Sequence, residues 1–216
     1  VPHYNLVYTT HLASTFTYNQ MNVQAKYLMF GVDPEVYKPI PNTPKTMDVS
    51  FVGTPYTQRE NLLRQAKLNP QLTKYNFQIM GGYGTKSPTW TDKHRLDPIE
   101  INKIINQTKI NLSFTDQPHG ITAMKCRLFE LTAAGGLVVT QFCQELSKFF
   151  DIGREIVVFH TAQDLVDRIV YYTQRPEEVQ AIALAGYRRT ITHHTYDKRV
   201  QIMLSDIEAV LHNIRR

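Results

Sequence analysis

The sequence predicts an α/β fold in which a parallel β-sheet carries helices on both faces, followed by a helical carboxy-terminal end. Three observations predict this fold. Strand-like and helix-like segments alternate between residues 48 and 159, which is typical of a parallel sheet built from crossover units. Residues 125–140 predict a helix, a tight turn at Gly135 and Gly136, and a buried strand. Beyond residue 160, apolar residues recur at the helical period of 3.6.

The first 44 residues are expected to be a remnant of a separate amino-terminal domain together with a linker. Residues 5–12 are rich in β-branched and aromatic types, and we expect a strand there. A polar stretch follows, and a second short strand is expected at 25–30. Prolines then punctuate the chain, as in linkers that separate domains. The chain begins at Val1 without an initiator methionine, so we expect a processed chain or an excised fragment that lacks most of that domain.

The main domain is expected to span residues 45–216. Apolar side chains at helical spacing mark its helices, and short runs of β-branched and aromatic residues mark its strands. The expected strands are 48–53, 76–80, 110–114, 137–140 and 155–159, and the expected helices between them include 56–68, 98–106 and a short helix at 144–150.

The last third of the chain is expected to be helical and structural. Thr161 followed by Asp164 is typical of a capped helix start, and Pro176 begins another helix. The final helix keeps an apolar stripe to its end, formed by Tyr196, Val200, Met203, Leu204, Ile207, Leu211 and Ile214.

Composition places the chain among ordinary globular proteins. Hydrophobic residues make up 42% of its 216 residues and charged residues 20%, enough for one sizeable core. The net charge is +5, but the basic residues are spread along the sequence. Because nucleic-acid binding needs a clustered basic surface, we expect no nucleic-acid partner.

The cysteines and histidines indicate no metal centre. Cys126 and Cys143 form no CxxC pair, and His193 and His194 lack a third ligand at suitable spacing. Two thiols without a disulfide framework fit a reducing compartment. No signal peptide or bilayer-spanning apolar run is present, so we expect a cytoplasmic protein without a membrane span.

Glu130 is the most informative charged residue. It lies within an apolar run, and an unpaired buried carboxylate is costly, so it should have a specific partner. A ribose diol would be one such partner. In the alternative interpretation, Lys125 and Arg127 are solvated surface cations and Glu130 pairs with one of them.

The pattern around this residue resembles the nucleotide-binding half of GT-B glycosyltransferases, in particular the CgeB-like branch of the glycosyl transferase group 1 superfamily. The resemblance runs from about Tyr27 onward. It is carried by Arg127, Glu130, the Ala-Ala-Gly-Gly run at 133–136, Thr140, Glu145 with Leu146, the segment 31–34, Tyr37, Pro39, the strand 48–53 and the segment 194–199.

The resemblance implies a Rossmann-like domain that forms the carboxy-terminal half of a GT-B fold. It implies transfer of a sugar from a nucleoside diphosphate donor to an unknown acceptor, with this chain alone expected to bind the donor. Lys125 and Arg127 are then candidates for stabilising the leaving diphosphate, His119 is a third candidate near the sugar, and Glu130 accepts the ribose hydroxyls. Because these cations can replace a divalent ion, neither a metal nor a cofactor is required.

Ligands of parallel α/β sheets bind in the loops at the carboxyl ends of the strands. The loop at 81–84 lacks the context of a dinucleotide fingerprint, and the chain has no P-loop, which disfavours oxidoreductase and P-loop ATPase functions. The predicted donor-binding residues are Gly53, Thr54, Arg59, Gly82, Tyr83, Ser113, Phe114, Gly120, Thr122, Phe129 and Glu130.

Thr122 departs from the pattern of the resembled family, because many relatives carry a second glutamate eight residues before the one matched by Glu130. The carboxylate that these relatives place near the donor sugar is therefore missing at Thr122. Two other functions stay open at this point. One is a non-catalytic interaction protein that keeps the fold, and the other is an isomerase of the UDP-sugar 2-epimerase type.

Overall fold

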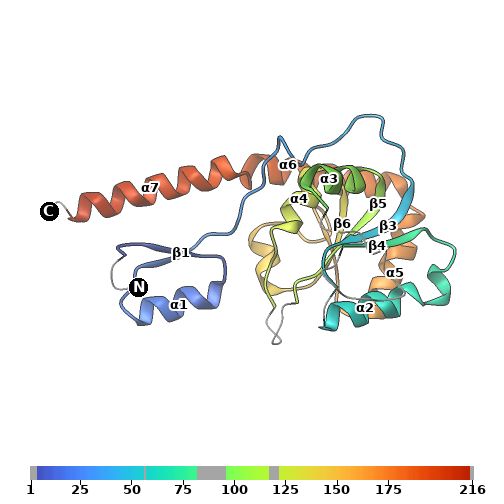
Figure 1. The fold of residues 1–216 in the computed structure, drawn as a ribbon, viewed down its shortest axis with the longest axis horizontal. Coiled ribbons are helices and arrows are strands. Elements are labelled where there is room, and N and C mark those ends of the chain that lie inside the picture. Colours follow the sequence, from blue (N-terminus) through green and yellow to red (C-terminus); the bar gives the residue numbers. More distant parts are fainter. Residues whose placement is uncertain (1–3, 56, 82–95, 117–121, 215–216) are drawn as a thin grey trace.

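The computed structural model describes residues 4–55, 57–81, 96–116 and 122–214. Figure 1 shows a layered α/β body and, beside it, an extension in which the last helix lies along the first strands and the first helix.

The body is built on a sheet of five parallel strands. These are β3 (Met47–Val52), β4 (Phe77–Met80), β5 (Thr108–Ser113), β6 (Leu137–Gln141) and β7 (Val157–Phe159). Their order is β4-β3-β5-β6-β7. Val49 of β3 pairs with Phe77 on one side and Ile110 on the other, so the carboxyl ends of these strands meet at one edge. The predicted parallel sheet is confirmed.

Helices cover both faces of this sheet (Figure 1). The helices α2 (Thr57–Lys67) and α5 (Ala162–Thr173) pack on strand residues such as Val49 and Phe51. The helices α3 (Pro98–Asn106) and α4 (Arg127–Ala133) pack on the alternate residues, including Val52 and Val138. Successive side chains of a strand point to opposite faces of the sheet. A continuous run of apolar residues in one strand therefore contributes to the hydrophobic core on each face.

Local signals determine where several helices begin. Asp97 accepts a hydrogen bond from the Glu100 amide at 2.8 Å and caps α3. Thr161 accepts from the Asp164 amide at 3.1 Å and caps α5, as predicted. Pro176 opens α6 (Pro176–His193), also as predicted. Proline lacks an N–H, and in the first turn of a helix that group would have no acceptor within the helix.

The amino-terminal prediction was wrong in part. The expected strand at 5–12 is reduced to β1 (Val7–Thr9), which pairs in parallel with β2 (Ala25–Tyr27). The polar stretch between them forms a helix, α1 (Leu12–Gln20). None of its residues is buried and no side chain caps its start, so the sequence lacked both usual helix signals. The short helix expected at 144–150 is a 3₁₀ helix, η3 (Gln144–Lys148), and a further 3₁₀ turn, η1 (Pro70–Leu72), follows α2.

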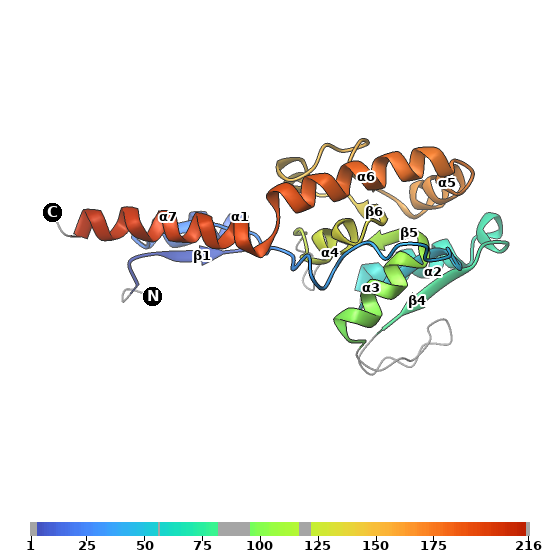
Figure 2. The same ribbon diagram turned by 90° about the horizontal axis from the view of Figure 1, so that it is seen from above.

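The last helix, α7 (Tyr196–Ile214), leaves the body and joins the extension, as Figure 2 shows from above. Its Asp206 accepts a hydrogen bond from the Tyr8 hydroxyl at 2.9 Å and pairs with Lys26 at 2.6 Å. None of the helices in the described ranges combines the length and apolarity needed to cross a bilayer.

Candidate functional site

The loops that follow β3 and β4 lie against each other at the carboxyl edge of the sheet. The Gly53 amide donates to the Met80 carbonyl at 2.9 Å. A β-carbon placed on Gly81 would lie 3.4 Å from the Gly53 nitrogen, and Gly81 has a φ of +90°. A side chain at Gly81 would therefore be strained, and glycine keeps the two loops in close contact.

Arg59 of α2 is buried and bound to protein groups. Its Nε donates to Asp116 Oδ1 at 3.2 Å, and its Nη2 donates to the Asp116 carbonyl at 3.0 Å. Its Nη1 donates to the Thr54 carbonyl at 3.1 Å, and the guanidinium lies over the rings of Phe51 and Phe114. Arg59 therefore joins the loop after β3 to the loop after β5.

Asp116 is the functional candidate that the sequence-based site omitted. It follows β5, is only 4% exposed, and forms an isolated antiparallel bridge with Thr122. Its position after a strand at the carboxyl edge of the sheet could have identified it as a site residue. Its pairing with Arg59 of α2 could not be predicted from the sequence. The bridge joins the loop after β5 to the segment before α4.

Lys125 lies beside this buried ion pair. Burial lowers the pKa of the Lys125 ammonium, the Arg59 guanidinium lowers it further, and the Asp116 carboxylate opposes both. The three groups carry one net positive charge at the edge where ligands of parallel sheets bind. An anion placed here would stabilise the ammonium that burial and Arg59 disfavour.

Arg127 and Glu130 form a separate pair on α4. Arg127 Nη1 lies 2.5 Å from Glu130 Oε2, although the two atoms lack hydrogen-bonding geometry. Burial raises the pKa of the nearby Tyr37 hydroxyl, and the Glu130 carboxylate raises it further. The structure thus pairs Glu130 with Arg127, whereas Lys125 lies within electrostatic range of Arg59 and Asp116.

The other predicted residues differ in accessibility. Phe129 is fully buried, with its ring 4.8 Å from that of His194, so its side chain offers no surface to a ligand. Ser113 and Phe114 are also buried at the end of β5. Gly82, Tyr83, His119 and Gly120 lie outside the described residues.

A cavity of about 290 Å³ lies between the extension and the segment before α4. Thr10, His11 and Phe30 come from the amino-terminal part, and Lys125 and Cys126 line the opposite wall together with two apolar neighbours. Nothing in the sequence indicated that His11 would lie across from Lys125. Lys125 therefore contributes both to the charged cluster and to this cavity.

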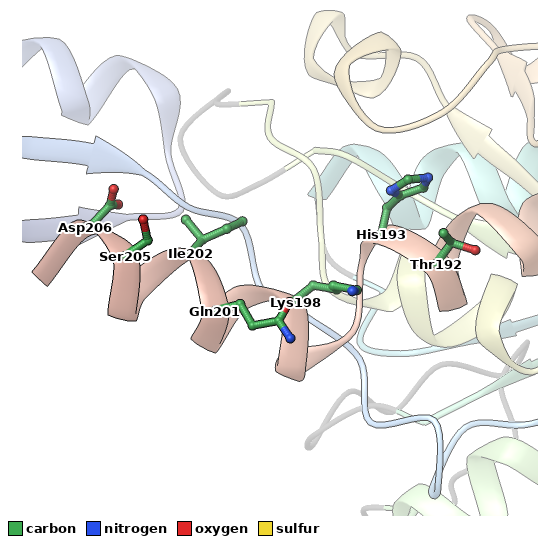
Figure 3. Close-up of a pocket in the computed structure, with 7 residues that line it drawn as sticks. All are labelled: Thr192, His193, Lys198, Gln201, Ile202, Ser205 and Asp206. Atoms are coloured by element: carbon green, nitrogen blue, oxygen red, sulfur yellow. The ribbon is translucent and has the colours of Figure 1, made fainter. Parts of the chain in front are cut away.

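A second hollow, of about 610 Å³, follows the junction of α6 and α7 (Figure 3). Its wall includes His193, Lys198 and Asp206, and it contains none of the predicted donor residues. Within the described ranges, no group of three or more histidine, cysteine or acidic side chains is placed to hold a metal ion. The carboxyl edge of the sheet therefore remains the candidate site.

Solved structures share this fold at low sequence identity. Sucrose-phosphate synthase from Thermosynechococcus elongatus superposes with a TM-score of 0.76 at 10% identity, over 96% of this chain and 59% of that one. HepE from Anabaena, in complex with UDP-glucose, gives a TM-score of 0.73 at 12% identity, over 95% of this chain and 64% of that one. The carboxy-terminal domain of LpcC, a glycosyl transferase group 1 family protein from Francisella tularensis, gives 0.58 at 14% identity, over 75% and 97%.

The chain thus spans about three fifths of the first of these proteins. No curated protein matches it by sequence. The family described as glycosyl transferase-like matches residues 58–205, which is more than half of the 216 residues. The chain therefore belongs to the glycosyl transferase-like family, and its α/β body has the fold of GT-B glycosyltransferase domains.

Proposed function

We propose that this chain carries the donor-binding part of a glycosyltransferase that uses a nucleoside diphosphate sugar. The observation that carries this proposal is the position of Lys125 against the buried pair of Arg59 and Asp116 at the carboxyl edge of the sheet. When the bond between the sugar and the diphosphate breaks, negative charge develops on the diphosphate. A cation already placed at this edge stabilises that charge without reorganising.

Each charged pair has its own role in this proposal. Lys125 contacts the diphosphate, and Arg59 acts from behind it by holding both the Thr54 and the Asp116 loops. Glu130 accepts the ribose hydroxyls, and Arg127 lies beside its carboxylate. HepE was solved with UDP-glucose, which supports a nucleoside diphosphate sugar as the ligand class. We place the chain in the CgeB-like branch on the residue pattern alone.

The acceptor and the rest of the catalytic apparatus belong to the facing part of the enzyme in this proposal. We assign residues 1–44 to that part and its linker and residues 45–216 to the donor-binding domain, whose last helix, α7, packs against the amino-terminal residues. The cavity between Lys125 and His11 opens between the two. It is the place where a donor sugar would meet an acceptor.

Calorimetric titration with UDP, GDP, ADP, dTDP and CDP tests the donor site. We expect one nucleotide to bind selectively and Lys125→Ala to weaken it roughly 10- to 100-fold, since hydrogen bonds to charged groups contribute about 1.5–3 kcal/mol. Lys103→Ala removes an exposed lysine from α3 and serves as the matched control. Binding that is equal in both variants would refute the role of Lys125, and no binding at all would favour a non-catalytic interaction protein.

Inorganic pyrophosphate separates the two halves of the ligand. We expect Glu130→Gln to weaken the selected nucleotide while leaving pyrophosphate binding unchanged, because only the nucleotide carries a ribose. Lys125→Ala should weaken both ligands. If Glu130→Gln weakens pyrophosphate as strongly as the nucleotide, the pair of Arg127 and Glu130 supports the site as a whole and does not read the ribose.

A further inference from the structure

A large cavity lies at the opposite edge of the sheet, at the amino ends of the strands. Its volume is about 690 Å³, within the range of roughly 300–1,000 Å³ typical of small-molecule sites. Its walls come from the linker, the first residues of β5 and β6, the connection between α5 and α6, and α6 itself. The lining residues used below are Pro39, Lys45, Lys109, Leu137, Val179 and Ala183.

The cavity is separate from the donor site. Lys109 and Leu137 stand at or next to the first residues of β5 and β6, whereas Asp116 follows the last residue of β5. A strand rises about 3.3 Å per residue, so the length of β5 alone separates the two sites by roughly 15–20 Å. None of the residues assigned to the donor lines this cavity.

The walls are mainly apolar, and the rim is positively charged. Leu137, Val179 and Ala183 contribute aliphatic surface. Lys109 pairs with Asp48 at 2.7 Å, which neutralises its charge. Lys45 donates to the Thr108 carbonyl at 3.0 Å and, within the described ranges, has no carboxylate within ion-pair distance.

Lys45 is therefore a cation with spare donors beside an apolar cavity. An ammonium group has three donors, and the Thr108 carbonyl uses one of them. Burial lowers the pKa of the Lys45 ammonium, so a bound anion would stabilise its charged form. The lining residues include no acidic side chain that could repel such an anion from within the cavity.

We propose that this cavity binds a free amphipathic small molecule whose apolar body packs between the linker and α6 and whose carboxylate pairs with Lys45. A molecule bound in the cavity would contact the linker, because Pro39 forms part of the wall. Pro39 also packs over Gly135, where a β-carbon would lie 3.2 Å from the proline ring. The site is thus placed to sense a metabolite away from the donor.

Decanoate, with decanol as the neutral probe of equal chain length, tests this site by calorimetry. We expect one decanoate to bind per chain and Lys45→Gln to weaken it about 10-fold, because a charge-assisted contact is lost. Decanol should bind the chain and Lys45→Gln equally. Lys103→Gln, which removes a lysine outside the cavity, should bind decanoate as the unaltered chain does.

Val179→Trp fills the apolar part and should abolish binding of both probes. An unchanged unfolding midpoint of this variant shows that it still folds, and Lys45→Gln tests the site independently by removing the charge without adding volume. Saturation with the selected nucleotide should leave decanoate affinity measurable. Absence of decanoate binding, equal affinity for the chain and Lys45→Gln, or competition with the nucleotide would each overturn the proposal.

Discussion

His194 illustrates how one side chain is fixed by its surroundings. Its Nε2 lies 3.0 Å from the Phe149 carbonyl, and its Nδ1 lies 3.1 Å from the Arg199 guanidinium. A carbonyl only accepts and a guanidinium only donates, so the ring is neutral with its proton on Nε2. Burial lowers the pKa of His194 to about 4, and the charge of Arg199 adds to this effect. Of the two adjacent histidines, His194 therefore has a structural role.

Stability should fall as the pH falls from about 6.5 to about 4. The unfolded imidazole takes up a proton below about 6.5, whereas the folded ring stays neutral until about 4. The free energy of unfolding should therefore lose up to about 3 kcal/mol from this group across that window, at no more than about 1.4 kcal/mol per pH unit. Urea unfolding at pH 7.5, 6, 5 and 4.5 measures this loss.

Two variants separate His194 from the other titrating groups. His194→Gln should be less stable at pH 7.5 and should show a shallower decline toward pH 4.5. His193→Gln, at the exposed neighbouring position, should decline as steeply as the unaltered chain. An equally steep decline in His194→Gln would assign the pH dependence to other residues.

Among the elements, helix α6 contains a glycine in its interior, where glycine is less favourable than most other residues. Gly186 lies within α6, and a β-carbon there would stand 2.4 Å from the Glu155 carbonyl oxygen. The same β-carbon would lie 3.3 Å from the Thr132 methyl group of α4, and the Thr132 hydroxyl lies 2.7 Å from that of Thr190. The glycine thus permits α6 to approach both α4 and the segment before β7.

Gly186→Ala should destabilise the protein. Alanine is favoured over glycine in a helix by about 1 kcal/mol, but the added methyl group meets a backbone oxygen that cannot move without shifting the segment before β7. We expect the free energy of unfolding to fall by about 1–3 kcal/mol, as for other overpacked sites. Chemical denaturation measures it.

Ala181→Gly, at an exposed position of the same helix, provides the propensity control and should cost only about 1 kcal/mol. A stabilising Gly186→Ala would mean that the helix shifts freely and that close packing does not require this glycine.

At the scale of the whole molecule, Arg199 joins the extension to the body. It is 7% exposed, and its Nε donates to the Met29 carbonyl at 2.7 Å. Its Nη1 donates to the His193 carbonyl at 3.0 Å. Next to it, the Val32 amide donates to the His194 carbonyl and the Tyr196 amide donates to the Val32 carbonyl. The segment from Met29 to Val32 and the junction of α6 and α7 therefore meet at one buried cation.

Arg199→Ala should loosen this junction and leave the sheet intact. Removing the guanidinium leaves buried carbonyls unpaired, which costs about 1–3 kcal/mol for each group. We expect hydrogen exchange of the Val32 and Tyr196 amides to accelerate at least about 10-fold, while amides of β5 and β6 keep their protection. Lys198→Ala, which alters an exposed neighbour on α7, should leave every rate unchanged. Uniform acceleration across the sheet would show that Arg199 stabilises the whole fold instead.

Much of the fold could be predicted from the sequence, but only part of the site. The strands and most helices were predicted to within a few residues because apolar periodicity reflects burial locally. The helix α1 was missed because it buries nothing, and Glu130 was singled out because a carboxylate stood in an apolar run. The partner of Arg59 lies 57 positions away and could not be predicted from spacing.

The sequence by itself determined the α/β sheet, the capped start of α5 and the family pattern around Glu130, because each depends on neighbours along the chain. Only the tertiary structure decided which charges face one another. The strand order places β5 directly beside β3, so Asp116 reaches Arg59. Lys125 comes within electrostatic range of that pair, while Arg127 pairs with Glu130. Side-chain pairing across strands depends on topology, and topology is fixed by the packing of the whole domain.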